Sequence, residues 1–178
     1  MLEDVDFRRP RDLNRARFAR LMTCRWVTEH QNLLLCGPTG IGNIYFASLA
    51  NQAYRQGHSA MYVRLKKLLV NLMLGRGDGS YGKTLAKLAR MTVLVIDVWP
   101  LPKLNDEGRR DLLEIFEDRH QAGSTIITIQ LPRRLWNDSI EDPTLADAIL
   151  NRLVHQANSL DLSGESLRKN DKLVLRYA

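Results

Sequence analysis

The glycine-rich segment GPTGIGNIY, residues 37–45, has residue types and a spacing that could bind phosphate. It follows the pattern Gly-x-x-x-x-Gly-Lys-Ser/Thr as far as its second glycine, with Gly37 and Gly42 at the two glycine positions. In such a loop the backbone curls so that its N–H groups point at phosphate oxygens. The following lysine and hydroxyl residue normally add a charge and a magnesium ligand, but here those positions hold Asn43 and Ile44. The candidate nucleotide-binding residues are Gly37, Pro38, Thr39, Gly40, Ile41, Gly42, Asn43 and Ile44.

Asp97 ends the apolar segment TVLVID, residues 92–97, and its carboxylate could hold magnesium through a water molecule. The next residue is often acidic in ATPases, where it orients the attacking water, but here it is Val98. Gln130 directly follows another apolar segment, residues 124–129, and is suited to contact a γ-phosphate. A lone aspartate at a strand end is often only a cap, but its place downstream of the glycine loop favours a nucleotide site. Asp97 and Gln130 are therefore candidate catalytic residues.

Short apolar segments alternate along the chain with longer amphipathic ones, and this pattern predicts an α/β fold. The turn-rich segment GRGDGSYG, residues 75–82, is expected to separate two of the helices. Strands that are apolar on both faces are typical of the middle of a parallel sheet, whose ligands bind beyond the carboxyl ends of the strands. We expect one domain over residues 1–178 with a five-stranded, mainly parallel sheet. The expected strands lie at 32–36, 59–64, 92–97, 124–129 and 158–162, and the expected helices at 43–56, 65–74, 82–90, 106–121 and 143–156.

The composition is ordinary for a globular protein, with 44% hydrophobic and 26% charged residues. The formal net charge is +6, which is compatible with a nucleic-acid partner. Residues 8–20 contain six arginines, and this stretch is either a solvated helix face or one that contacts phosphates. Because the sequence has neither an apolar stretch of membrane-span length nor an apolar signal core, we expect a cytoplasmic protein with no membrane contact. Cys24 and Cys36 lie in no metal-binding or disulfide pattern.

The chain resembles the IstB family of transposition helper ATPases, which are AAA+ proteins related to the bacterial helicase loader DnaC. The resemblance covers nearly the whole chain and is carried by many collinear segments. It implies a three-layer P-loop NTPase fold with an AAA+ core. It also implies that members bind ATP and Mg²⁺, form homo-oligomers on DNA and assist a partner transposase. The segments are LEDVDFRRPRDLNRA, CRWVTEHQNLLLCGPTGIG, ASLANQAYRQGHSAMYVRL, DGSYGKTLAKLAR, VLVIDVWPLPKL, RRDLLEIFEDRH, STIITIQLP, DPTLADAILNRLVHQA and SGESLRK.

The resemblance also implies roles for residues that spacing alone does not single out. Arg152, in ILNRLVH, matches an arginine that reaches the ATP of a neighbouring subunit. Arg168, in GESLRK, matches an arginine that acts as a second nucleotide sensor. For DNA we expect weak, salt-sensitive binding through phosphate contacts. The candidate DNA-contacting residues are Arg8, Arg9, Arg11, Arg15 and Arg17.

The chain departs from the family pattern within the nucleotide site. The family has lysine and threonine where this chain has Asn43 and Ile44, and an acidic residue where it has Val98. It usually has glycine in place of Pro100 and a small hydroxyl residue in place of Ile129. Family members carry an additional N-terminal region, associated with DNA and partner contacts, and we expect this chain to lack it.

Three functions stay open at this point. The first is a transposition helper that binds ATP and DNA but hydrolyses ATP poorly. The second is a non-catalytic scaffold, or a decayed copy, that keeps the AAA+ fold and its interfaces. The third is a DnaC-like helicase loader in replication. ATP binding separates the first from the second, and genomic neighbourhood separates transposition from replication.

Overall fold

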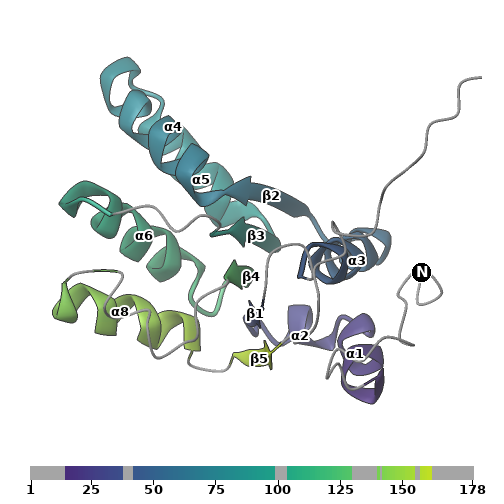
Figure 1. Ribbon diagram of the computed structural model, residues 1–178. Helices are drawn as coiled ribbons and strands as arrows, with labels where there is room; N and C mark the ends of the chain where they lie inside the picture. The colour runs from purple at the N-terminus through teal and green to yellow at the C-terminus, as the bar shows by residue number, and fades with distance from the viewer. Residues whose placement is uncertain are drawn as a thin grey trace, which may run out of the picture.

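The computed structural model describes residues 15–37, 42–98, 104–129, 140, 142–154 and 157–161 (Figure 1). Helices and strands alternate along the chain, as the sequence predicts. The elements are α1 (Arg15–Met22), α2 (Arg25–Thr28), β1 (Leu33–Cys36), α3 (Gly42–Arg55), β2 (Ala60–Arg64), α4 (Leu65–Asp78), α5 (Tyr81–Arg90), β3 (Val93–Asp97), α6 (Asp106–Arg119), β4 (Ser124–Ile129), α8 (Pro143–Val154) and β5 (Asn158–Asp161).

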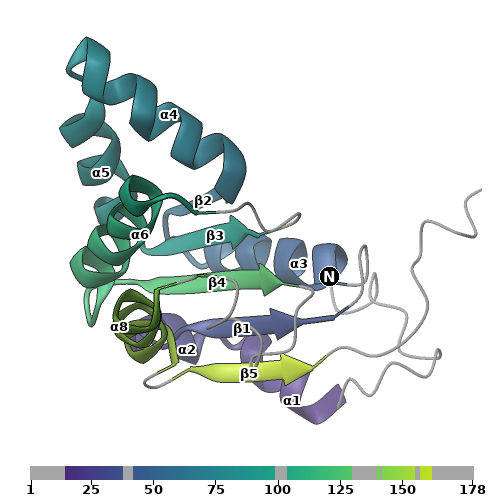
Figure 2. The same ribbon diagram turned by 60° about the vertical axis from the view of Figure 1, so that its left-hand side comes forward.

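The five strands form one parallel sheet in the order β2-β3-β4-β1-β5, and Figure 2 shows their arrows pointing the same way. The parallel five-stranded sheet expected from the sequence is therefore confirmed. β4 lies between β1 and β3 and pairs Thr128 with Asp97 and Ile129 with Cys36. β1 ends where the glycine loop begins, and β3 ends at Asp97. These two strand ends therefore lie at one edge of the sheet, on either side of β4.

Helices cover both faces of this sheet, which gives three layers (Figures 1 and 2). Side chains alternate between the two faces along each strand. In β1, Leu33 and Leu35 pack in the apolar cluster formed with α1, α2 and α3, whereas Leu34 and Cys36 pack in the cluster formed with α4, α5, α6 and α8. β1 is buried at all four positions, and this explains why its sequence is continuously apolar rather than alternating.

The segment GRGDGSYG differs from its prediction. Helix α4 does not end near residue 74 but continues through Gly75, Arg76 and Gly77 to Asp78, and the chain reverses only at Gly79, whose φ is +78°. Two tertiary contacts outweigh the weak helix propensity of the glycines. A Cβ on Gly75 would lie 3.0 Å from the backbone nitrogen of Tyr81, so glycine allows α4 and α5 to approach closely. Arg76 is held by an ion pair to α6.

That ion pair belongs to a polar cluster that fixes the α4–α5 hairpin on α6. Both guanidinium nitrogens of Arg76 donate to the carboxylate of Asp111, which is 2% exposed, with one N–O distance of 3.2 Å. The guanidinium also lies over the ring of Tyr81, 4.3 Å from its centroid. The Tyr81 hydroxyl lies 2.9 Å from Asp111 Oδ1 and 2.8 Å from Glu114 Oε2. Burial, and then the two carboxylates, raise the pKa of Tyr81. The hairpin is therefore fixed to the body of the protein.

Two helices precede β1, where the sequence interpretation expected only a helix face within residues 8–20 and gave no helix bounds. They bury Phe18, Leu21, Trp26 and Val27 against the sheet, and the Trp26 indole donates to the carbonyl of Leu21 at 2.9 Å. The reversal between them falls at Cys24, whose φ is +58°. The signal for this packing was the spacing of large apolar residues among the arginines.

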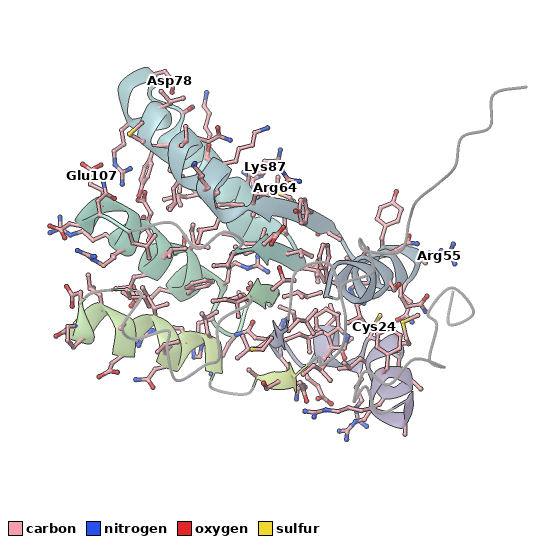
Figure 3. All side chains as sticks on the ribbon, viewed as in Figure 1. Cys24, Arg55, Arg64, Asp78, Lys87 and Glu107 are labelled. Carbon is pink, nitrogen blue, oxygen red and sulfur yellow. The ribbon has the colours of Figure 1, made fainter. Side chains whose placement is uncertain are left out.

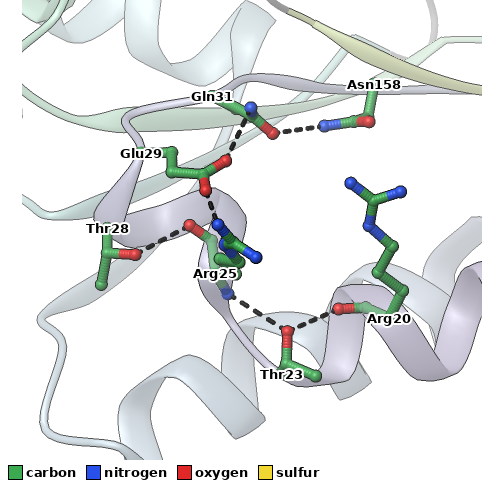
Figure 4. Close-up of polar contacts among 7 residues, drawn as sticks. All are labelled: Arg20, Thr23, Arg25, Thr28, Glu29, Gln31 and Asn158. Atoms are coloured by element: carbon green, nitrogen blue, oxygen red, sulfur yellow. Dashed lines mark hydrogen bonds and ion pairs between the residues drawn. The ribbon is translucent and has the colours of Figure 1, made fainter.

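A chain of side-chain hydrogen bonds joins α2 to the edge strand β5 (Figure 4). Arg25 Nε donates to Glu29 Oε1 at 2.7 Å, and Gln31 Nε2 donates to Glu29 Oε2 at 2.9 Å. Asn158 Nδ2 in turn donates to Gln31 Oε1 at 2.8 Å. These contacts hold the segment before β1 against the start of β5.

Arg119 fixes the opposite end of α6. Its buried guanidinium donates to the carbonyls of Leu88, Met91 and Ser124 and to the hydroxyl of Thr125, at 2.7 to 3.0 Å. Burial lowers the pKa of Arg119 to about 10. This side chain therefore ties the end of α5 and the start of β4 to α6.

The helices are short compared with a membrane span. The longest helices that the structure describes, α3, α4 and α6, have 14 residues each, whereas a span needs about 20. In the part of the chain that the structure describes, no helix is long and apolar enough to cross a membrane.

Candidate nucleotide-binding site

Asp97 stands at the carboxyl edge of the sheet with both carboxylate oxygens hydrogen-bonded. The Tyr62 hydroxyl of β2 donates to Oδ2 at 2.8 Å, and the Thr128 hydroxyl of β4 donates to Oδ1 at 3.1 Å. Paired residues of a parallel ladder point to the same side, and Asp97 pairs with both Arg64 and Thr128. The carboxylate is therefore positioned by the two strands beside its own. Sequence reasoning named Asp97 as a candidate but did not name its partners Tyr62 and Thr128.

Tyr62 is itself held in place by α3, the helix that follows the glycine loop. Its ring stacks on Phe46, with centroids 5.6 Å apart and an angle of 8° between the rings. Arg64 Nε lies 3.4 Å from the Tyr62 hydroxyl. Partial burial, together with the hydrogen bond to Asp97, raises the pKa of Tyr62, and the bond to Tyr62 raises the pKa of Arg64. The aromatic stack places Asp97 and α3 on the same face of the sheet.

The glycine loop begins at this same edge. The backbone N–H of Gly37 donates to the carbonyl of Ile129 at 3.1 Å, which extends the pairing of β1 and β4 beyond the last strand residue. Residues 38–41 lie outside the described part of the chain, and α3 starts at Gly42. A helix N-terminus that faces the end of a parallel sheet offers free N–H groups and a positive dipole end to an anion. Strand, loop and helix thus have the order that a phosphate site requires.

The side chains of this site supply only some of the ligands that normally hold a magnesium ion. Mg²⁺ keeps several waters and is commonly held by one or two carboxylates together with substrate phosphates, so Asp97 suffices for a water-mediated contact. The position that normally adds a hydroxyl ligand holds Ile44, which has no oxygen. Among the described residues there is no group of three or more His, Cys, Asp or Glu that could hold a metal without a nucleotide. Any Mg²⁺ here would therefore depend on phosphate oxygens and on Asp97.

Val98 directly follows Asp97 at this edge of the sheet, but its side chain lies in the core. It is 7% exposed and lies in the apolar cluster that also contains Leu65, Leu104 and Ile129. Its backbone N–H donates to the Thr128 carbonyl at 3.0 Å, so Val98 follows the β3–β4 ladder on the face opposite Asp97. A cavity of about 50 Å³ lies within this cluster. Two of the departures from the IstB pattern, Val98 and Ile129, therefore pack in one apolar cluster.

Arg152 lies near the amino ends of the strands, on the opposite side of the sheet from Asp97. Asn32, which precedes β1, donates to the Arg152 carbonyl at 3.2 Å, and the Arg152 guanidinium forms an ion pair with Glu117 Oε1 at 3.1 Å. The side chain is 38% exposed. The structure therefore does not bring Arg152 to Asp97 within one chain, and any contact with ATP would be to that of a neighbouring copy.

The remaining sequence-predicted site residues are only partly described. Arg15 lies on α1, and Arg17 of the same helix is exposed. The others lie outside the described residues: Gln130, Arg168, Arg8, Arg9, Arg11, Pro38, Thr39, Gly40, Ile41 and Pro100.

The sheet order, the loop at the end of β1 and the aspartate at the end of β3 define a P-loop NTPase fold of the AAA+ class. Known structures agree with this assignment. The crystal structure of the DnaC helicase loader matches with a TM-score of 0.71 at 19% identity, over 91% of this chain and 96% of that chain. The crystal structure of DnaI matches with a TM-score of 0.74 at 19% identity, over 91% and 90%.

Sequence comparison then identifies the family. The family described as IstB-like ATP binding protein matches residues 1–174, and the chain belongs to this family. An insertion sequence ATP-binding protein of Sinorhizobium fredii is 48% identical over 171 residues, which are 96% of this chain and 70% of that protein. The ATP-binding protein of insertion sequence IS21 of Pseudomonas aeruginosa is 28% identical over 172 residues, covering 96% and 65%.

Proposed function

We propose that this chain is the ATP-binding helper of an insertion sequence, that it acts with a transposase on DNA, and that its ATP hydrolysis is impaired. The observation that best supports this proposal is the contrast between the two halves of the site. Asp97 is positioned by hydrogen bonds from both neighbouring strands, whereas Asn43, Ile44 and Val98 replace the phosphate-binding, metal-binding and water-orienting residues.

The size of the defect follows from the chemistry of phosphoryl transfer. Losing one charge-assisted contact, here that of the missing lysine, costs about 1.5–3 kcal/mol. That loss corresponds to roughly a ten- to a hundredfold decrease in nucleotide affinity. Turnover should suffer more than binding, because catalysis in this class depends on positioning and electrostatics, without a covalent step to fall back on.

Arg152 supports a proposal about assembly. Within one chain it lies at the sheet edge away from Asp97, exposed enough to reach another molecule. In the proposed function it acts on the ATP of a neighbouring subunit, so activity requires an oligomer. The Glu117 ion pair would then have to open, which costs little because exposed pairs are worth about 0–1 kcal/mol.

The test is steady-state phosphate release by wild type and by a repaired variant carrying Asn43→Lys, Ile44→Thr, Val98→Asp and Ile129→Ser. Ile129→Ser accompanies Val98→Asp because the two side chains occupy one apolar cluster. We expect wild type at background, and repaired activity that rises more than linearly with protein concentration. Adding Arg152→Ala should abolish this activity and spare ATP binding. Robust wild-type hydrolysis would contradict the proposed impairment.

A non-catalytic subunit is the second candidate, and one observation favours it. Val98 and Ile129 are buried together in the core, so the fold is maintained with apolar residues where hydrolysis needs polar ones. Such a subunit would still present Arg152 to an intact neighbour. No binding of ATP at millimolar concentration, together with stimulation of an intact relative's ATPase, would favour this candidate over the first.

A further inference from the structure

The carboxyl edge of the sheet holds a cation beside Asp97 that the sequence interpretation did not single out. Arg64 is the last residue of β2 and pairs with Asp97 across the β2–β3 ladder, so the two side chains lie on one face of the sheet. The Arg64 side chain is exposed, and Figure 3 shows it where β2 meets α4. Because Asp97 is the aspartate of the candidate nucleotide site, Arg64 borders the place where that site needs positive charge.

Two hydrogen bonds connect Arg64 to Asp97 through Tyr62. Arg64 Nε donates to the Tyr62 hydroxyl at 3.4 Å, and this hydroxyl donates to Asp97 Oδ2 at 2.8 Å. The guanidinium is therefore one hydroxyl group away from the Asp97 carboxylate. The Tyr62 ring stacks on Phe46 of α3, so these contacts lie on the same face of the sheet as the helix that follows the glycine loop.

The described residues use little of the hydrogen-bonding capacity of Arg64. A guanidinium has five N–H donors, and the bond from Nε to Tyr62 uses one of them. Within the described ranges Arg64 forms no ion pair, and as the N-cap residue of α4 it makes no side-chain capping bond. The four N–H groups of its two terminal nitrogens are therefore available to a phosphate, which a guanidinium can bind through two parallel hydrogen bonds.

The surroundings of Arg64 favour a bound anion. Arg64 precedes α4, and Lys66 and Lys67 lie in the first turn of this helix, which contains no acidic residue. The positive end of a helix dipole is normally stabilised by acidic side chains, and cations there are unfavourable. Asp97, the carboxylate beside them, already accepts hydrogen bonds from Tyr62 and Thr128. Positive charge is therefore in excess at this corner of the sheet.

We infer that Arg64 binds the phosphates of the nucleotide and replaces part of the charge that is missing at Asn43. This inference rests on the proposed function for ATP as the ligand. Position 43 approaches the site from α3, after β1, whereas Arg64 approaches it from β2, on the other side of β3 and Asp97. Arg64 neutralises phosphate charge that Mg²⁺ would otherwise neutralise, so ATP binding by this chain depends little on the metal.

The test is calorimetric titration of ATP in EDTA at low ionic strength, where exposed charges are screened least. Arg64→Gln removes the charge and should lower ATP affinity about three- to tenfold, the modest end of the range for a charge-assisted contact because Arg64 is exposed. Arg64→Lys keeps the charge and should retain most of the affinity. If Arg64 acted only by orienting Tyr62, Tyr62→Phe would reproduce the whole loss.

A double-mutant cycle with Asn43→Lys tests whether both positions serve the same phosphates. Once Asn43→Lys has restored the charge on α3, Arg64→Gln should cost less than about twofold in affinity. Additive losses would show that Arg64 does not stand in for the missing lysine. Arg64→Gln should also increase the factor by which Mg²⁺ raises ATP affinity, because the metal then has no competing cation.

A contact by Arg64 has to be separated from the general positive field of the protein, because the α4–α5 hairpin alone carries six lysines and arginines and one carboxylate. Lys87→Gln is the matched control. Lys87 is exposed in the last turn of α5, which leads to the amino end of β3, and its loss should change ATP affinity less than about twofold. Thermal unfolding should find Arg64→Gln at least as stable as wild type, since it removes a cation from a helix N-terminus.

Four results would overturn the inference: unchanged ATP affinity in Arg64→Gln, an equal loss in Lys87→Gln, an equal loss in Arg64→Lys, or a clearly lower unfolding temperature of Arg64→Gln. ATP binding by wild type that does not depend on Arg64 rejects this inference alone and leaves the proposed function intact. No ATP binding by wild type at millimolar concentration rejects both, and binding by Asn43→Lys in the same assay then shows that the fold still accepts ATP.

Discussion

The Asp97 carboxylate accepts a hydrogen bond from the strand on each side of it, through Tyr62 of β2 and Thr128 of β4. A water molecule bound to magnesium would have to donate to the same carboxylate oxygens. Tyr62 is 46% exposed and is stacked on Phe46, so its hydroxyl is accessible to solvent while its ring is fixed. In the proposed function, the tyrosine hydroxyl would therefore compete with a metal-bound water for the Asp97 carboxylate.

Tyr62→Phe tests this competition. The variant keeps the aromatic stack and removes the Tyr62 hydrogen bond to Asp97 Oδ2, so the factor by which Mg²⁺ raises nucleotide affinity should increase. Stability should fall by only about 0.5–1.5 kcal/mol, the value of one hydrogen bond. Nucleotide titrations with and without Mg²⁺ provide the measurement. Tyr54→Phe is the matched control, because Tyr54 is 69% exposed. An unchanged Mg²⁺ effect in Tyr62→Phe would show that the hydroxyl does not compete.

The buried position of Val98 gives a second prediction. Val98→Asp alone should destabilise the protein by roughly 3 kcal/mol, because it places a carboxylate in an apolar cluster without a partner. Val70→Asp is the control, since Val70 is 43% exposed on α4, and its cost should stay near the helix-propensity difference, below about 0.7 kcal/mol. Urea unfolding measures both. Equal costs would mean that the side chain at position 98 can turn towards solvent.

At the scale of elements, the sequence predicted the strands well and the hairpin poorly. β1, β3 and β4 were predictable because a run of apolar residues between polar ends fits only a strand buried on both faces. The end of α4 was not predictable, because the glycines of GRGD favour a turn locally. The contact that keeps them helical, Arg76 with Asp111, joins residues 35 positions apart in the sequence. Tertiary contacts of this kind leave no local pattern.

Arg76→Met is therefore expected to loosen the hairpin. It removes both the pair to Asp111 and the contact over Tyr81, and it leaves Asp111, which is 2% exposed, with the Tyr81 hydroxyl alone. Removing one partner of a buried pair is strongly destabilising because it leaves an uncompensated charge, so the free energy of unfolding should fall clearly more than in the control. Arg110→Met, at an exposed position on α6, should stay within about 0.5 kcal/mol. Equal losses of unfolding free energy in the two variants, measured by urea unfolding, would show that Arg76 does not hold the hairpin on α6.

At the scale of the whole molecule, sequence reasoning correctly placed the start of the glycine loop and Asp97 at one edge of the sheet but missed the distribution of charge. The loop and Asp97 could be paired from the sequence, because both follow apolar strands and the carboxyl ends of parallel strands share one edge. Tyr62 could not, since its contact with Asp97 depends on β2 being the neighbour of β3. The six arginines of residues 8–20 drew attention to the N-terminus, although nearby carboxylates offset most of their charge. The α4–α5 hairpin carries the excess positive charge, and this is the element whose helix boundary the sequence interpretation placed incorrectly.

The central claim is that this fold retains a P-loop nucleotide site that has lost its lysine and its metal ligand. The most direct test is calorimetric titration of ATP, with and without Mg²⁺, into wild type and into Asn43→Lys/Ile44→Thr. We predict that wild type binds ATP about ten- to a hundredfold more weakly than this variant. We also predict that Mg²⁺ strengthens binding to the variant far more than to wild type. Equal affinity in the two proteins, with an equal gain from Mg²⁺, would contradict the claim.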